Sequence, residues 1–319
     1  MKLDCLAEVC YKPLGEKGED AFAYNLARDD IQAIAVFDGC GGAGAWKYQE
    51  FKNATGAFVA SQAVANRFLS WFDTISPAIL NDTESLANSF LADSRSLLLN
   101  LKNHCAPMGV SGSLVKSFPC TASIAMVSQS NNDTLVLTAL NVGDSRVYFL
   151  TPSDGLVQLT TDDSRGHPDP LDSLRDNAPL SNLLNADKPY SVKTRQIALQ
   201  YPFAILCATD GVFGFVRSPM DFEFLLLKSI VESNSIEEFE NQLKSSIIDI
   251  TGDDSTCLIA FYGWNSYSEI KTGLTPRYKE VVNIVRLINH AQTSDERENV
   301  IRSQWEKYKK HTVFDEMRG

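Results

Sequence analysis

Short runs of strand type dominate the first 263 residues and limit the folds that the chain can adopt. They are apolar or alternating, they are bounded by Gly, Asn, Asp or Pro, and they cover residues 31–37, 121–128, 134–140, 146–150, 192–199, 203–208 and 255–262. Only Asn141-Val142-Gly143-Asp144-Ser145 separates the two runs within 134–150, which is too short for a crossover helix. This spacing predicts a hairpin there, and antiparallel sheets in place of a repeating βαβ pattern.

Helical periodicity interrupts these runs in two blocks. Apolar residues recur at three- and four-residue intervals in residues 49–72, 84–104, 221–232 and 236–250. The pattern therefore predicts an α+β fold in which helices pack outside the sheets.

The charge is unevenly distributed along the 319 residues, which hold 29 Lys+Arg and 40 Asp+Glu for a formal net charge of -11. Residues 264–319 contain 10 of the basic and 8 of the acidic side chains, which leaves 19 against 32 for residues 1–263. This shift predicts a domain of residues 1–263 and an extension of residues 264–319. The extension contains two candidate helices, 276–291 and 295–310, which we expect to pack back on the domain as a helical hairpin. A separate partner-binding module is the alternative.

Several classes of protein are disfavoured by the composition. The acidic balance and the lack of a basic patch argue against nucleic acid as a partner. No uninterrupted apolar run approaches the roughly 18 residues of a membrane span, and acids stand where a secretory signal would be apolar. Seven cysteines without a C-x-x-C pair fit neither a disulfide framework nor a zinc knuckle. We therefore expect a cytoplasmic protein that does not bind a membrane.

Acidic residues beside glycines stand at the ends of several strand-type runs. They are Asp38 in Phe37-Asp38-Gly39, Asp210 in Thr209-Asp210-Gly211, Asp253 in Gly252-Asp253-Asp254, Glu19 and Asp20 after Gly18, and Asp144 after Gly143. Each one alone is explained by ordinary turn chemistry. If the strand ends converge, however, so many like charges require a cation among them, and carboxylate and carbonyl oxygens select Mg²⁺ or Mn²⁺. Two such ions would suit hydrolytic phosphoryl chemistry.

A series of motifs in this order resembles the metal-dependent protein phosphatases, the type 2C serine/threonine phosphatase family. The matching segments are Gly18-Glu19-Asp20-Ala21-Phe22, Val36-Phe37-Asp38-Gly39-Cys40-Gly41-Gly42, Cys120-Thr121-Ala122-Ser123, Asn141-Val142-Gly143-Asp144-Ser145-Arg146-Val147-Tyr148, Gln158-Leu159-Thr160-Thr161-Asp162-Asp163-Ser164, Ala208-Thr209-Asp210-Gly211-Val212-Phe213 and Asp253-Asp254-Ser255-Thr256. They span residues 1–263, and their combination is far more specific than any one of them.

The resemblance implies a four-layer α-β-β-α sandwich with two Mn²⁺ or Mg²⁺ ions at one end. It implies that Asp38 bridges both ions, that the Gly39 carbonyl binds one, and that the other ion is bound by two further acids, Asp210 and Asp253. A weak third ion would use Asp144. Glu19 and Asp20 would hold metal-bound waters, and a metal-bridging hydroxide would hydrolyse phosphoserine and phosphothreonine monoesters. The implied partners are phosphorylated proteins, with a serine/threonine kinase acting in opposition.

The chain departs from the family pattern at several positions. Gly15 stands where relatives often have a phosphate-gripping Arg, which leaves Lys17 and Lys12 as the nearest cations and Lys17 as the candidate substrate-binding residue. Cys40 replaces the His or Met of relatives, so we expect a metal-bound water to protonate the leaving group. Gly214 replaces a further Asp, which would weaken a third ion, and Asp254 replaces the usual Asn.

Two other functions compete with this interpretation. The missing Arg and Cys40 are compatible with a catalytically weak or inactive scaffold that binds a phosphoprotein or a kinase, although Asp38, Asp210 and Asp253 are retained. The glycines of residues 39–44 could cradle a nucleotide phosphate, but the Gly-Lys-Ser/Thr ending of such loops is lacking.

Overall fold

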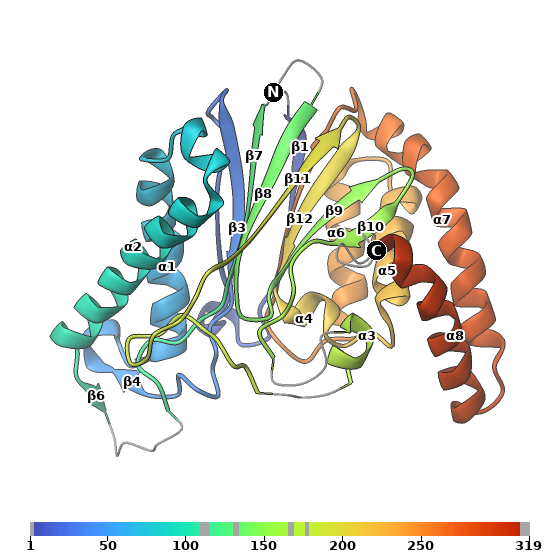
Figure 1. Cartoon of the computed structure of the whole chain (residues 1–319). Coiled ribbons are helices and arrows are strands. Elements are labelled where there is room, and N and C mark those ends of the chain that lie inside the picture. Colours follow the sequence, from blue (N-terminus) through green and yellow to red (C-terminus); the bar gives the residue numbers. More distant parts are fainter. Residues whose placement is uncertain (1–2, 109–114, 130–133, 165–168, 176–178, 313–319) are drawn as a thin grey trace.

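Two five-stranded antiparallel sheets lie face to face at the centre of the molecule (Figure 1). The computed structural model describes residues 3–108, 115–129, 134–164, 169–175 and 179–312. The first sheet has the order β1 (Leu3–Tyr11), β13 (Ser255–Tyr262), β12 (Phe203–Ala208), β9 (Arg146–Thr151), β10 (Gly155–Gln158). The second has the order β11 (Lys193–Gln200), β8 (Thr134–Val142), β7 (Ala122–Gln129), β3 (Ile31–Phe37), β2 (Ala21–Asn25). A small sheet combines β5 (Ala54–Thr55), β4 (Lys47–Tyr48) and β6 (Pro107–Met108).

Helices cover the outer face of each large sheet. On the second sheet lie α1 (Gly56–Asp73) and α2 (Thr83–His104), and on the first lie α5 (Pro219–Glu232) and α6 (Ile236–Ile248), with α7 (Tyr267–His290) packed against α5 (Figure 1). Apolar side chains fill all three interfaces between layers. Because β3, β12 and β13 are buried on both faces, their sequences are mostly apolar, and that of β12 is apolar throughout. The expected α+β fold, a four-layer sandwich, is thus confirmed.

The helix expected from residue 49 begins later than the periodicity predicts. Residues 47–55 instead form β4, a short 3₁₀ helix and β5, and α1 begins at Gly56. Lys52 and Asn53 have φ angles of 54° and 62°, in the left-handed region that a right-handed helix cannot include. Thr55 then caps α1 by accepting a hydrogen bond from the Phe58 N–H at 3.1 Å.

The predicted hairpin over residues 134–150 is wrong. Strand β8 pairs with β7 and β11, whereas β9 pairs with β12 and β10, so residues 143–145 cross from one sheet to the other. Gly143 makes this crossing with a φ of 98°, and a Cβ there would lie 2.6 Å from the Thr121 side chain. A short connection excludes a crossover helix. However, it can lead to a strand in the facing sheet as well as to a neighbouring strand in the same sheet.

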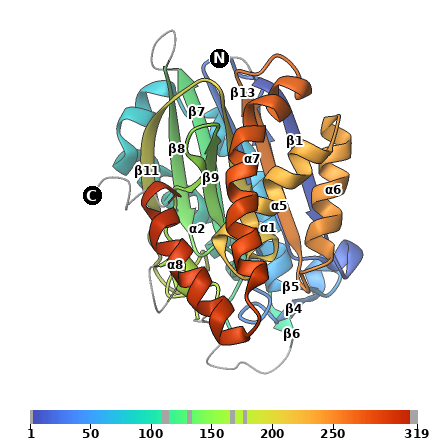
Figure 2. The ribbon, with the colours of Figure 1, turned by 90° about the vertical axis from the view of Figure 1, so that its right-hand side faces the viewer.

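The extension begins directly after β13. Helix α7 starts at Tyr267, nine residues before the predicted start, because Ser266 caps it at 3.2 Å from the Glu269 N–H and Pro276 is accommodated inside it. Helix α8 (Ser294–Thr312) starts where Thr293 accepts a hydrogen bond from Glu296, close to the predicted start. Figure 2 shows α7 beside α5, and α8 beside α7. Among the described residues, no helix combines the length and hydrophobicity that a membrane span needs.

Candidate metal centre

The strand ends that carry the acidic motifs meet at one end of the sandwich, where α4 (Asp210–Phe213) begins (Figure 1). Asp38 follows the last residue of β3, which pairs with Ala21, the residue after Asp20. Asp210 follows the end of β12, whose Ala208 pairs with Cys257 near the start of β13. Asp144 lies in the connection between the two sheets. The topology therefore gathers acids from both sheets at one end.

Backbone contacts fix Asp38 and Gly39 in this end. The Asp38 N–H donates to Thr121 Oγ1 at 3.3 Å, its carbonyl accepts from the Thr121 N–H at 2.8 Å, and the Thr121 hydroxyl lies 2.6 Å from that of Ser145. This chain of contacts ties the end of β3 to the loop of Asp144. A Cβ at Gly39 would lie 2.8 Å from the carbonyl oxygens of Ala57 and Glu19, so the close approach of these backbones requires glycine.

The acids at this end raise one another's pKa. Burial, followed by the charges of Asp210, Asp20 and Asp144, holds the pKa of Asp38 well above its usual value. Burial and then Asp253 raise the pKa of Asp210. Burial also raises the pKa of Asp20 to about 7 and that of Asp144 to about 8, with further contributions from Asp210. Such mutual repulsion shows that Asp38, Asp20, Asp144, Asp210 and Asp253 are close enough to interact.

Two oxygens of this cluster have no hydrogen-bond partner. Asp20 Oδ1 and Asp144 Oδ1 are buried and unpaired, although Asp20 Oδ2 accepts from the Thr209 hydroxyl at 2.8 Å. No group of three His, Cys, Asp or Glu side chains among the described residues is drawn together tightly enough to hold a metal ion. Orphaned buried oxygens cost free energy until something binds them. The acids present therefore fit an oxygen-bound cation.

Glu19 lies beside the cluster, held by Asp254 of the last motif and by Thr55, which lies in none of the motifs. Its N–H donates to Asp254 Oδ2 at 2.5 Å, and its carboxylate accepts a hydrogen bond from the Thr55 hydroxyl. Burial, and to a lesser degree Asp254 and Asp253, raise its pKa. Asp254 could have been suspected as the second acid of a pair, whereas Thr55 could not, because only the fold brings it to Glu19.

The structure separates the two candidate cations near Gly15. The Lys12 amine donates to the carbonyls of Asp20 at 2.6 Å and Gly18 at 3.4 Å, so it stabilises the segment that contains Glu19 and Asp20. Lys17 is exposed at the end of a 3₁₀ helix, Gly15–Lys17. Cys40 borders the cluster, and burial together with the charge of Asp38 raises the pKa of its thiol well above the usual value.

Arg146 is a buried cation behind Asp144. Its guanidinium donates to the Asp162 carboxylate at 2.9 and 2.6 Å, and it lies 4.2 Å from the centre of the Phe213 ring. Its charge acts to lower the pKa of both Asp144 and Asp210, against the larger effect of burial. The site therefore includes a fixed positive charge close to Asp144 and Asp210.

Comparison with known proteins finds solved structures with a similar fold. Among solved structures, the fold is similar to serine/threonine phosphatase Stp1 from Staphylococcus aureus, with 20% identity, a TM-score of 0.62 and coverage of 83% of this chain and 96% of that chain. It is also similar to the Mycobacterium tuberculosis phosphatase PstP/Ppp, with 16% identity, a TM-score of 0.55 and coverage of 82% and 99%. A catalytic domain of PstP solved in complex with two manganese ions has 17% identity, a TM-score of 0.53 and coverage of 81% and 97%.

No curated protein matches the sequence significantly. The family model for Protein phosphatase 2C, however, matches residues 14–246. That range includes Glu19, Asp20, Asp38, Asp144 and Asp210, whereas α7 and α8 lie beyond its end. Since the match covers well over half of the chain, the protein belongs to the protein phosphatase 2C family.

Proposed function

We propose that the protein is a metal-dependent serine/threonine protein phosphatase, which removes phosphate from phosphoserine and phosphothreonine side chains. The observation that carries this proposal is the cluster of mutually repelling carboxylates, buried at Asp20 and half-buried at Asp38, Asp144 and Asp210, with unpaired oxygens in a chain of this family. Its substrates would be phosphorylated proteins, and a serine/threonine kinase would act in opposition.

Two Mn²⁺ or Mg²⁺ ions fit the donor set best. Asp38, the Gly39 carbonyl, Asp210 and Asp253 would hold them, and Asp144 would hold a weak third ion. When bound, the ions would activate water for in-line attack on phosphorus and neutralise the charge of the transferring group.

The chain's own contribution is to orient water. Thr209 fixes Oδ2 of Asp20, so the unpaired Oδ1 is the atom available to accept a hydrogen bond from water. Glu19, held by Thr55 and Asp254, would orient a second water. Arg146 provides fixed positive charge behind the cluster.

A phosphoprotein-binding scaffold is the second candidate, because Gly15 leaves the phosphate without a guanidinium clamp. Release of inorganic phosphate from a phosphothreonine peptide in Mn²⁺ distinguishes the two. The proposed function predicts multiple turnovers per protein molecule. A peptide that binds in Mn²⁺ but releases no phosphate would favour the scaffold.

Lys17 is expected to assist substrate binding, since it is the exposed cation nearest the acids in the chain. We predict that Lys17→Ala raises KM for the phosphothreonine peptide about threefold and leaves kcat unchanged, because an exposed ion contact contributes up to about 1 kcal/mol. Steady-state kinetics at low ionic strength measure this effect. Lys244→Ala, at an exposed position of α6, is the matched control. An unchanged KM in Lys17→Ala would remove Lys17 from the binding site.

A further inference from the structure

Helix α8 lies beyond the family match but contacts a segment that borders the candidate metal centre. The Trp305 indole N–H donates to both carboxylate oxygens of Asp169, at 2.8 and 3.0 Å, and the Lys309 amine lies 3.4 Å from the same carboxylate. Asp169 in turn caps the short helix α3 (Pro170–Ser173) by accepting from the Leu171 N–H at 2.9 Å. One carboxylate thus joins the start of α3 to α8.

Apolar packing and ion pairs extend this contact. A separate small core consists of Leu171 from α3, Met220 from α5, Ile288 from α7, and Ile301, Trp305 and Tyr308 from α8. At its rim, Arg302 pairs with Asp172 at 3.2 Å, and Arg175 pairs with Glu298. Leu171 is fully buried in this core, so the position of α3 depends on α8.

A buried ion pair fixes α8 itself. The Tyr308 hydroxyl donates to Glu223, whose side chain is fully buried. Arg277 of α7 donates to both oxygens of that carboxylate, at 2.8 and 2.9 Å, and the Leu156 N–H adds a bond of 3.0 Å. Such a pair tolerates no sliding of the helix, because a shift would leave a buried charge without its donors.

The other side of α3 is joined to the metal centre. Arg146 donates to the Ser173 hydroxyl at 2.9 Å as well as to Asp162. The N–H groups of Asp163 and Gly143 each bond to the other residue, at 2.9 and 3.0 Å, and Gly143 precedes Asp144. Further along the same segment, Leu184 pairs with Cys120, which pairs with Gly39. The described residues between 159 and 184 therefore run beside the candidate ligands.

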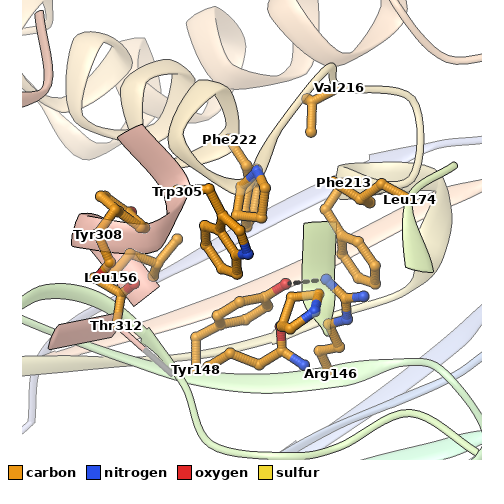
Figure 3. A pocket seen from close by; sticks show the side chains of 13 residues that line it. Arg146, Tyr148, Leu156, Leu174, Phe213, Val216, Phe222, Trp305, Tyr308 and Thr312 are labelled. Atoms are coloured by element: carbon orange, nitrogen blue, oxygen red, sulfur yellow. Dashed lines mark hydrogen bonds between the residues drawn. The ribbon is translucent and has the colours of Figure 1, made fainter. Parts of the chain in front are cut away.

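Figure 3 shows the junction between these parts, with Trp305 of α8 beside Tyr148, whose hydroxyl accepts a hydrogen bond from Arg146, and Tyr308 beside Leu156. The cavity among them has a volume of about 20 Å³, which is room for one water molecule. It is too small for a ligand. The role of α8 is therefore mechanical support of its neighbours.

We infer that α8 is a brace that fixes residues 169–175 and thereby shapes the surface on which a phosphoprotein binds beside the metal centre. This inference rests on the proposed function. A small aryl phosphate needs only the centre, whereas a peptide or protein extends over the neighbouring segment. Loosening of α8 should therefore weaken the binding of large substrates selectively.

The test is Trp305→Phe in the full chain, compared with Trp264→Phe. Both tryptophans are 3% exposed, but Trp264 packs against Phe261, in the core between the first sheet and its helices. The substitution at 305 keeps an aromatic ring and removes the bonds to Asp169. Both substitutions also replace an indole by a smaller ring in a core, so the control accounts for the lost volume. We expect hydrogen exchange of the hydrogen-bonded amides in 169–175 to become roughly tenfold faster, equivalent to about 1.4 kcal/mol, in Trp305→Phe alone. KM for a phosphothreonine peptide should rise several-fold, while kcat/KM for a small aryl phosphate changes less than about twofold.

Each outcome decides one part. Equal exchange rates in both variants and the parent protein would overturn the brace. Faster exchange with equal kinetic changes for the two substrates would overturn the role in binding large substrates. A parent protein that hydrolyses neither substrate would overturn the proposed function and the substrate part of the inference, while exchange, measured on the free protein, still decides the brace.

Discussion

Asp38→Asn is expected to lower kcat for a phosphothreonine peptide in Mn²⁺ by at least about a thousandfold, because it removes the carboxylate that the family places between both ions. The same substitution is expected to raise the melting temperature of the metal-free protein by about 1–3 °C. In EDTA at a pH high enough to ionise Asp38, the neutral amide no longer repels Asp210, Asp20 and Asp144, whose charges raise the pKa of Asp38. Activity thus falls while the melting temperature rises. A misfolded variant would lose both, so the two explanations for lost activity can be distinguished. Phosphate release and thermal unfolding in EDTA measure the two effects.

Asp221→Asn is the matched control for this substitution. Asp221 is also a buried acid, but on α5 it is paired with Arg217 and Ser218 and lies outside the cluster. We expect it to keep activity within about twofold and to lower stability, because it loses a charged partner. Asp210→Asn should behave like Asp38→Asn. Retention of activity in both cluster variants would show that the acids do not form the catalytic centre.

Metal removal is expected to abolish hydrolysis and to make stability fall as the pH rises from 5.5 to 8.5. The folded pKa values of Asp20 and Asp144 are about 7 and about 8, above the ordinary value of 3.8. A raised folded pKa means that the folded state binds protons more tightly than the unfolded state. The stabilisation is therefore complete below about pH 4 and is lost as the pH rises through 7 and 8. We expect the melting temperature in EDTA to fall by at least about 5 °C across this range.

Excess Mn²⁺ should reverse this trend, because the cation replaces the protons and binds better once they have left. The increase in melting temperature caused by Mn²⁺ should therefore be larger at pH 8.5 than at pH 5.5. Carboxylates with lowered pKa, such as Asp187, lose their contribution only in more acidic solution and do not affect this window. Asp144→Asn should flatten the pH dependence in EDTA. A melting temperature that is independent of pH in EDTA would be incompatible with a buried acid cluster.

The sequence predicted the strands that are buried on both faces and failed where local and long-range signals differ. Continuous apolar runs such as 203–208 can only be inner strands, so they were predicted correctly. Strand β1 was missed because Asp4 and Glu8 interrupt its apolar positions, although it pairs with β13 along its length. The hairpin predicted at 134–150 was wrong for a different reason. A short loop between two strands has the same sequence signal whether the strands pair in one sheet or lie in facing sheets.

The candidate site was predicted to a similar extent. The acids could be named because Asp or Glu beside Gly at strand ends is visible in sequence. The groups that hold them could not, because Thr121, Thr209 and Thr55 reach Asp38, Asp20 and Glu19 only through the fold. The ligand assignments of Asp38, Gly39, Asp210, Asp253 and Asp144 stay predictions until a metal-bound structure tests them.

The crossing at Gly143 affects how the two sheets can separate during unfolding. Asp38 and Asp20 belong to one sheet and Asp210 and Asp253 to the other, while the crossing carries Asp144 between them. Ions shared among these acids would link the two sheets, in addition to the apolar core that packs between them. Any motion that slides one sheet over the other would have to break coordination bonds first. In such an enzyme, loss of metal ends catalysis and also frees the two halves of the sandwich to separate.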